Sequence, residues 1–371
     1  MDIMVTSSHL LADLTTSLDV EGREHLVIVV KSSWQIPRRG ARPRPIAPQP
    51  LEAGDVFFAD PGTSPMKYGS DLVRYKPRCD ILFDAQAHAP AGAPVTELVA
   101  GFKVGTLQKG VKVIGPRKWR VRLGMASLTK PDPFVSMPLH FGFAFGGTRT
   151  YQKGRGDKVQ TLTETLASNP VGLGWMGPNT GAELHDLPAP SLELLDDPVR
   201  SPTGKHRPAA FSAVARNWPV RRQYAGTYDA HWQQQTFPFL PEDFDEQFHQ
   251  CAPADQQIPY PKGGEEVVLL NLMAGHEIVR FKLPALDKLQ IRVLRKDYSV
   301  ATPVPVVDTL YFEPDSERFT AVWRASVPVL RRIQEFDTVA IGPIDLQWWS
   351  NKILGVDGNG CTGCDSRKEA A

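Results

Sequence analysis

Residues 304–325, VPVVDTLYFEPDSERFTAVWRA, decide the fold class of this chain. Two runs rich in β-branched and aromatic residues flank the segment EPDSER. Pro314 and Asp315 suit a turn, because proline presets its backbone angle and aspartate bonds to nearby backbone groups. The pattern predicts a β-hairpin, and it is the clearest one in the sequence.

Further strand candidates surround this hairpin on both sides. They are residues 24–34, 78–88, 95–104 and 289–295, with VKVIG and KWRVRL following Gly110. The segment PAGAP between the second and third runs suggests that these two form another hairpin. Many short strands with little amphipathic helix favour antiparallel pairing, because parallel strands need long helical crossovers. The sequence therefore predicts a mainly β fold, with antiparallel β-sandwich-like sheets, long ordered loops and few short helices.

The domain organisation follows from how these strands are distributed. We expect one large β-rich domain over 1–345, with strands in 20–140 and 263–345. Between them, 141–262 has frequent Pro and Gly and no lasting periodicity, which predicts a loop-rich insertion. Its tryptophans favour order, since flexible linkers seldom contain them. The Gly-rich, charged end at 346–371 predicts a flexible tail.

Two short helices are expected in the second half of the chain. Residues 241–251 (PEDFDEQFHQC) place a proline and acids in the first turn, with Phe244 and Phe248 on one face. Residues 327–336 form the second candidate.

Charge and hydropathy exclude several function classes. Lys and Arg number 42 against 41 Asp and Glu, so the net charge of +1 does not favour nucleic acid or anionic lipid. The basic stretch over 38–44 is rich in Pro and Gly and predicts a solvated loop. The first residues lack a basic, apolar leader, and no apolar run reaches the roughly 20 residues of a membrane helix. We expect a cytoplasmic protein without nucleic-acid or membrane partners.

Cofactor and metal motifs are weak. GLGWMG at 172–177 has the glycine spacing of a dinucleotide site, but flanking prolines exclude a following helix and favour a loop. Cys361 and Cys364 form a single Cys-x-x-Cys, which supplies only half of a zinc site. Cys79 and Cys251 are isolated, so no disulfide framework is expected. We therefore predict no cofactor and no metal, with the CTGC cysteines as the only weak metal candidates.

Catalytic motifs are missing from the sequence. It contains no Gly-x-Ser-x-Gly elbow, no Walker loop and no His-Glu-x-x-His, and its nine histidines are scattered. The sequence does not favour an enzyme. A hydrolase-like enzyme stays as an alternative, because Asp243, Asp245, His231 and His249 could gather in a cleft.

A dense aromatic segment supplies the candidates for partner binding. Rings offer large contact area at low entropic cost, so they suit either a docking surface or an anchor for loops, and the anchoring role is favoured. The polar segment ADQQI could bond to its neighbours or to a partner. The candidates are Tyr228, Trp232, Phe237, Phe239, Phe244, Phe248, Asp255 and Gln256.

Six sequence blocks, in this order, resemble one bacterial family. They are ADPGTSPMKYGSDL with YKPRCDILFDAQAHAP, then MPLHFGFAFGGT, SNPVGLGW, AGTYDAHWQQQTFPFLPEDFDEQFHQCAPADQQI and VVDTLYFEPDSERFTAVWRASVPV. Their order and spacing resemble the domain-of-unknown-function family 2169 over residues 20 to 345.

The resemblance implies a type VI secretion accessory protein without enzyme activity. Such a protein is expected to act as an adaptor or chaperone that binds a toxic effector. It would help to load that effector onto the PAAR-motif spike tip or the spike protein. Besides the hydrolase-like enzyme, a zinc-stabilised binding module that uses the CTGC cysteines is an alternative.

Overall fold

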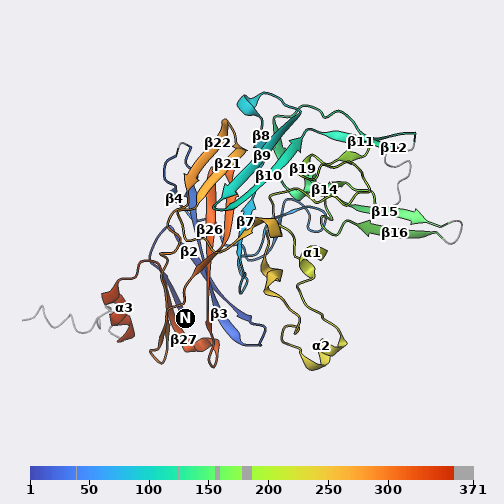
Figure 1. Ribbon diagram of the computed structural model, residues 1–371. Helices are drawn as coiled ribbons and strands as arrows, with labels where there is room; N and C mark the ends of the chain where they lie inside the picture. Colours follow the sequence, from blue (N-terminus) through green and yellow to red (C-terminus); the bar gives the residue numbers. More distant parts are fainter. Residues whose placement is uncertain (39, 124, 155–158, 178–185, 355–371) are drawn as a thin grey trace, which may run out of the picture.

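The computed structural model describes residues 1–371 apart from 39, 124, 155–158, 178–185 and 355–371. Strands dominate the described chain, and the few helices are short (Figure 1). The predicted fold class is confirmed. Among the named strands all pairs are antiparallel except β1–β27, β14–β17 and β25–β7.

A seven-stranded central sheet runs through the molecule in the order β2-β3-β26-β25-β7-β20, with β4 added to β3. Its strands are β2 (Leu11–Leu18), β3 (Glu24–Gln35), β4 (Arg44–Ile46), β7 (Cys79–Phe83), β20 (Gln257–Ile258), β25 (Val306–Glu313) and β26 (Arg318–Pro328). The predicted hairpin is confirmed as β25 and β26, joined by the short 3-10 turn Pro314–Ser316.

Two further sheets cover one face of the central sheet. The five-stranded sheet has the order β19-β10-β9-β21-β22, and the four-stranded sheet has the order β1-β27-β23-β24. Their strands are β9 (Glu97–Val104), β10 (Leu107–Ile114), β19 (Leu192–Leu194), β21 (Glu266–Met273) and β22 (His276–Lys282), and β1 (Asp2–Val5), β23 (Ile291–Arg295), β24 (Val300–Ala301) and β27 (Phe336–Ile341).

Aromatic rings fill the space between the central and five-stranded sheets. Phe83 of β7 lies 4.5 Å from Phe102 of β9, and Phe319 of β26 lies 5.5 Å from Phe281 of β22. Alternate residues of a strand point to one face, so each strand contributes every second side chain to this core. One cluster of buried apolar residues joins all three sheets.

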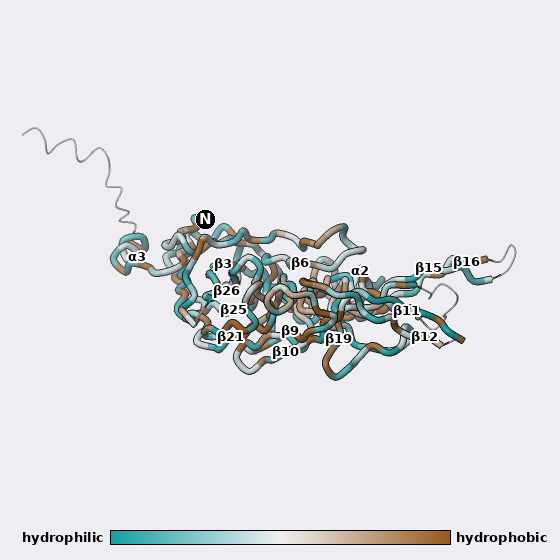
Figure 2. Tube along the Cα trace, turned by 90° about the horizontal axis from the view of Figure 1, so that it is seen from above, coloured by the Kyte–Doolittle hydropathy of each residue, from teal (hydrophilic) through white to brown (hydrophobic). Residues whose placement is uncertain are grey.

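Small sheets and helices complete the fold. The remaining elements are β5 (Val56–Phe57), β6 (Met66–Tyr68), β8 (Gln86–His88), β11 (Arg117–Arg122), β12 (Met125–Leu128), β13 (Ser136–Pro138), β14 (Phe145–Gly146), β15 (Thr148–Lys153), β16 (Gln160–Thr165), β17 (Leu173–Gly174), β18 (Pro188–Ala189), α1 (Pro219–Arg222), α2 (Ala230–Gln235) and α3 (Leu346–Ile353). Seen from above, the molecule is elongated, with α3 at one end and β15–β16 at the other (Figure 2).

The prediction that 78–88 and 95–104 form a hairpin is wrong. Strand β7 belongs to the central sheet, β8 pairs with β13, and β9 pairs with β10 and β21. Strands β7 and β9 therefore lie in two different sheets that pack face to face across the core, and they are not hydrogen-bonded neighbours in one sheet. Both arrangements demand the same alternation of apolar residues, so periodicity does not distinguish them.

The helix predictions also need correction. In 241–251 the structure has only a 3-10 turn, Glu246–His249, which Asp245 caps. The residues before Asp245 are not helical. In 327–336, β26 extends to Pro328 and a 3-10 turn occupies Ile333–Glu335. The expected flexible tail begins with α3 instead.

Helix α3 forms because Asp345 caps its N-terminus, where the carboxylate accepts a hydrogen bond from the backbone N–H of Trp348 at 2.7 Å. Trp349 is buried in a small cluster with Leu294 and Ala340 of the four-stranded sheet. Trp349 and Ile353, four positions apart, lie on one face of the helix and both join this cluster.

Candidate protein-binding site

Residues 225–244 form an arm that leaves the body of the protein and carries α2 near its tip (Figure 1). The Asp243 carboxylate closes the base of this aromatic arm. It accepts hydrogen bonds from the backbone N–H of Thr227 at 2.8 Å and from its hydroxyl at 2.7 Å. The backbone N–H of Asp245 donates to the carbonyl of Tyr224 at 3.0 Å. The arm is therefore a closed loop with a defined neck.

Trp232 organises the tip of the aromatic arm. Its indole N–H donates to the carbonyl of Phe239 at 2.9 Å. Its ring lies edge-on to Tyr228 at 4.7 Å and to Phe237 at 5.6 Å. Asp229 caps α2 by accepting a hydrogen bond from the backbone N–H of Trp232 at 2.9 Å. Asp229 is not among the residues predicted from the sequence, although an aspartate at the start of a short helix is a common capping pattern.

Three aromatic rings of the arm are exposed to solvent. Tyr228 is 54% exposed, Phe237 66% and Phe239 47%. A Cβ placed on Gly22 would lie 2.8 Å from the ring of Phe239, so the arm also packs against the β2–β3 turn. Large exposed rings that are held in place by neighbours are typical of binding surfaces, because little entropy is lost on contact.

Phe244 and Phe248 lie at the base of the arm and have the anchoring role. Both are half-buried, and their ring centroids are 6.0 Å apart. The guanidinium of Arg221 lies 5.6 Å from the ring of Phe248, and its Nε donates to the Phe248 carbonyl at 2.7 Å. The candidates thus divide into exposed rings at the tip and anchoring rings at the base.

The two polar candidates bond to their neighbours. Asp255 pairs with the ammonium of Lys109 at 2.9 Å and keeps an exposed side chain. Gln256 is fully buried, accepts from Lys109 at 2.7 Å, and donates to the carbonyls of Ile81 at 2.7 Å and Phe211 at 3.1 Å. Of the two roles predicted for this segment, Gln256 has the contact with neighbours, because its side chain satisfies the backbone of two interior segments.

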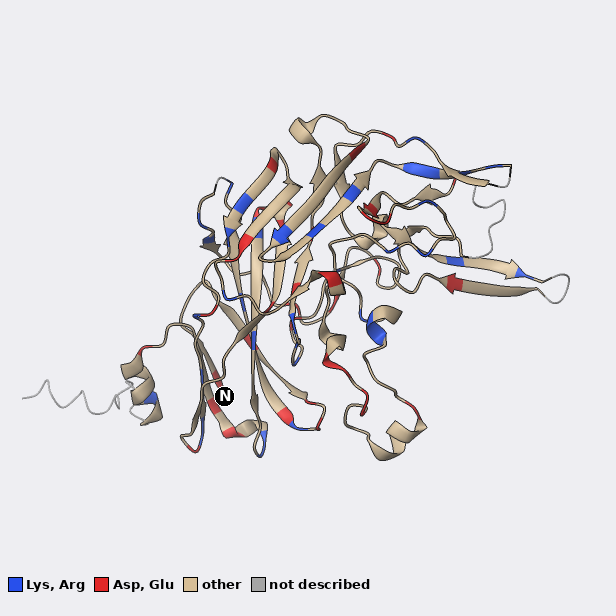
Figure 3. Cartoon of the chain, viewed as in Figure 1, with Lys and Arg blue, Asp and Glu red and all other residues tan. Residues whose placement is uncertain are grey.

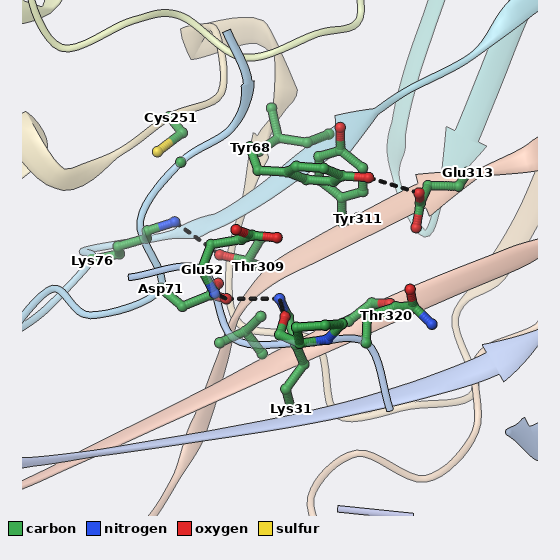
Figure 4. A pocket seen from close by; sticks show the side chains of 15 residues that line it. Lys31, Glu52, Tyr68, Asp71, Lys76, Cys251, Thr309, Tyr311, Glu313 and Thr320 are labelled. Atoms are coloured by element: carbon green, nitrogen blue, oxygen red, sulfur yellow. Dashed lines mark hydrogen bonds and ion pairs between the residues drawn. The ribbon is translucent and has the colours of Figure 1, made fainter. Parts of the chain in front are cut away.

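The second face of the central sheet forms a buried polar pocket beneath the segment 49–76 (Figure 4). Lys31 pairs with Asp71 at 2.7 Å, and the Tyr68 hydroxyl donates to Glu313 at 2.8 Å. The cavity of this pocket measures about 60 Å³. Sites for small-molecule ligands usually enclose about 300–1,000 Å³, so this cavity has room only for water.

The charged groups around this pocket are paired rather than poised for proton transfer. Burial opposes the charge on Lys76, but the neighbouring Asp80 carboxylate outweighs it and raises the pKa of Lys76. Burial likewise opposes the charge on Glu313, while hydrogen bonds from Arg318 and Tyr68 hold its pKa below the usual value. Both groups stay ionised at neutral pH, which suits a structural network.

The residues of the enzyme alternative serve separate local roles. Asp243 holds the neck of the arm, and Asp245 caps the 3-10 turn by accepting from the backbone N–H of Gln247 at 2.8 Å. His231 lies on exposed α2, whereas His249 is largely buried with Nε2 3.6 Å from Glu246. Asp243, Asp245 and His249 thus have separate local contacts, and His231 is exposed on α2.

Metal ligands do not gather in the described part of the chain, where no three His, Cys, Asp or Glu side chains lie close enough to hold an ion. Cys79 and Cys251 are buried free thiols. The weak metal candidates Cys361 and Cys364 lie outside the described residues.

The glycines of 172–177 serve close packing. Gly172 and Gly174 lie around β17, which pairs with β14. A Cβ on Gly172 would lie 2.5 Å from the carbonyl oxygen of Ala144. Within 172–177 only Leu173–Gly174 is a strand, and residues 178–185, where a following helix would begin, lie outside the described residues.

The fold and the arm define a mainly β protein that presents preorganised aromatic rings on its surface. The family model DUF2169, described as an uncharacterized protein conserved in bacteria, matches residues 21–324, and the chain belongs to this family. No curated protein and no solved structure matches the chain. None of the helices in the described residues is long and apolar enough to cross a membrane.

Proposed function

We propose that this protein is an adaptor or chaperone of a bacterial type VI secretion system. It holds a toxic effector through the aromatic arm in the cytoplasm and helps to load it onto the PAAR-motif tip or the spike protein. The observation that carries the binding role is the group of exposed rings at the tip of the arm, Tyr228, Phe237 and Phe239. The secretion context rests on the resemblance of the six sequence blocks.

The geometry of the arm supports binding more than catalysis. Trp232 fixes the neighbouring rings before any partner binds. The arm therefore loses little conformational entropy when a partner binds to it. The buried pocket of Figure 4 has room for water only, and its charged groups are paired.

Co-purification tests this function directly. Tagged protein is expressed with the effector encoded beside it, with and without the PAAR-motif protein. We expect the effector to co-purify with the wild-type chain. The double variant Tyr228→Ala, Phe237→Ala should lose it, since buried aromatic anchors commonly contribute about 2 kcal/mol or more each to an interface.

A matched control separates the arm from exposed aromatics in general. Tyr298 is 64% exposed and lies in the turn between β23 and β24, away from the arm in sequence. The variant Tyr298→Ala should retain the effector. If the effector binds both variants as well as it binds wild type, the arm is not the binding site. If it never binds, even with the spike-tip protein present, the adaptor function is wrong.

A further inference from the structure

Strand β22 is an edge strand of the five-stranded sheet. Within the described residues it pairs with β21 on one side and with no strand on the other. Figure 1 shows it at the edge of the sheet, beside the chain that leads into β4. An edge strand presents a row of backbone groups to which another chain can bond.

The pairing of β22 identifies which groups face outward. The backbone N–H of Leu283 donates to the carbonyl of Glu265, and its own carbonyl accepts from Gly264, both at 3.0 Å. The backbone N–H and C=O groups of Leu283 therefore point toward β21, and so do those of Phe281 and Val279. The residues between them, Ile278, Arg280 and Lys282, point their N–H and C=O groups toward the open side.

A groove lies beside this edge. It measures about 680 Å³ and is lined on one side by residues 280–285 and on the other by residues 40–43. Its size falls within the range of about 300–1,000 Å³ that is usual for ligand sites. Phe281 and Leu283 are buried at its inner wall. An extended chain entering this groove would meet both backbone groups and an apolar base.

The charged residues that line the groove indicate which kind of peptide segment can bind there. Arg42, Arg280 and Lys282 line the groove with one acid, Glu266, whose carboxylate is already paired with Lys103 at 2.8 Å. Arg42 and Lys282 form no ion pair with any described residue. In Figure 3 blue Lys and Arg positions mark the ribbon of β22 and of the loop beside it, and β22 also carries one red acidic position. The groove is positive, so it favours an acidic partner.

We propose that β22 is a docking edge for an extended acidic segment of a partner protein. The segment adds as a sixth strand by bonding to the outward groups of Ile278, Arg280 and Lys282. The same cations repel the β22 edge of a second copy, which is how charged edges prevent self-association. This inference goes beyond the adaptor function and does not depend on the aromatic arm.

Three labelled peptides test the proposal by fluorescence anisotropy at low ionic strength. The first is a fluorescein-labelled peptide of alternating Glu and Val residues. The second has Lys in place of Glu, and the third is the acidic peptide with alternate backbone nitrogens methylated. We expect only the first to bind, with at least a tenfold weaker affinity for the other two. Equal binding of the methylated peptide would mean attraction by charge alone and would overturn strand addition.

Protein variants and amide exchange locate the site. The double variant Arg42→Glu, Lys282→Glu should lose the acidic peptide, whereas Lys288→Glu, a charge reversal at a lysine outside the groove, should keep it. Circular dichroism checks that each variant is folded. In wild type, the peptide should slow hydrogen exchange at the backbone N–H groups of Ile278, Arg280 and Lys282. Unchanged exchange there, or no binding of the acidic peptide at all, overturns the proposal. Effector capture by the arm is scored separately.

Discussion

The carboxylate of Asp80 lies 2.9 Å from the ammonium of Lys76, and both side chains are buried. The same carboxylate accepts hydrogen bonds from the backbone N–H of Cys251 at 2.8 Å and of Ala252 at 3.0 Å, and from the side chain of Gln250. One aspartate thus ties β7 of the central sheet to the segment that follows the aromatic arm.

Removing this carboxylate is expected to destabilise the protein strongly. In Asp80→Ala the Lys76 ammonium stays buried without its counterion, and two backbone N–H groups lose their acceptor. Breaking a buried pair from one side costs about 3–5 kcal/mol. Guanidinium denaturation measures the loss. The control Lys103→Ala removes an exposed pair with Glu266 and should change the free energy of unfolding by less than about 1 kcal/mol. Equal effects would contradict the structural role of Asp80.

The central hairpin could be predicted from the sequence because its evidence is local. In 304–325 the turn residues and the strand residues lie side by side, and β25 and β26 pair as expected. The partner of β7 could not be predicted. Its neighbour β25 lies more than 200 positions later in the chain, and the apolar pattern of 78–88 fits a ladder or a facing sheet equally well.

The candidate site was predictable in residue type and less so in exposure. Aromatic density marked the segment around Trp232, yet nothing local distinguishes the exposed Phe237 from the anchoring Phe248. That difference arises from the neck formed by Thr227 and Asp243, which turns one end of the segment outward. The role of Asp80 could not be predicted, because all its partners except Lys76 lie in the segment 250–252, about 170 positions later in the chain.

Lowering the pH from 7 to 4 should destabilise the protein through His249. Burial and, after it, the positive charges of Arg221 and Arg324 lower the pKa of His249 to about 3. The nearby Glu246 does not reverse this, since Arg74 pairs with the same carboxylate. In the unfolded chain the pKa of histidine is about 6.5, so between these values the unfolded state binds the proton.

The sign of the effect follows from that difference in proton binding. The free energy of unfolding should fall as the pH drops below about 6.5, by up to about 1.4 kcal/mol per pH unit from this group. The variant His249→Gln removes the titration and should show a shallower decline when unfolding is measured from pH 7 to 4. An unchanged slope in His249→Gln would assign the acid sensitivity to other groups.

The glycine-rich segment around β17 should tolerate no side chain at Gly174. Its φ is +81°, and a Cβ there would lie 2.6 Å from Cδ of Pro190. We expect Gly174→Ala to lower the free energy of unfolding by about 1–3 kcal/mol, since both backbone strain and overpacking oppose it. Gly54 has open space and no positive φ, so Gly54→Ala should leave the melting temperature unchanged or slightly raised. A loss as large for Gly54→Ala would show that glycine content alone matters.

The tip of the aromatic arm should loosen without unfolding the body when Trp232 loses its hydrogen bond. Trp232→Phe keeps a ring against Tyr228 and Phe237 but removes the N–H that donates to Phe239. Such a bond contributes about 0.5–1.5 kcal/mol, all of it local to the arm. Hydrogen exchange should therefore accelerate within 228–240 while the global free energy of unfolding changes by less than about 0.5 kcal/mol. Because the exposed rings are then less preorganised, effector capture should weaken although no exposed ring has been removed. Unaltered exchange in the arm would mean that the ring contacts alone hold it, and normal capture with faster exchange would mean that preorganisation does not matter for binding.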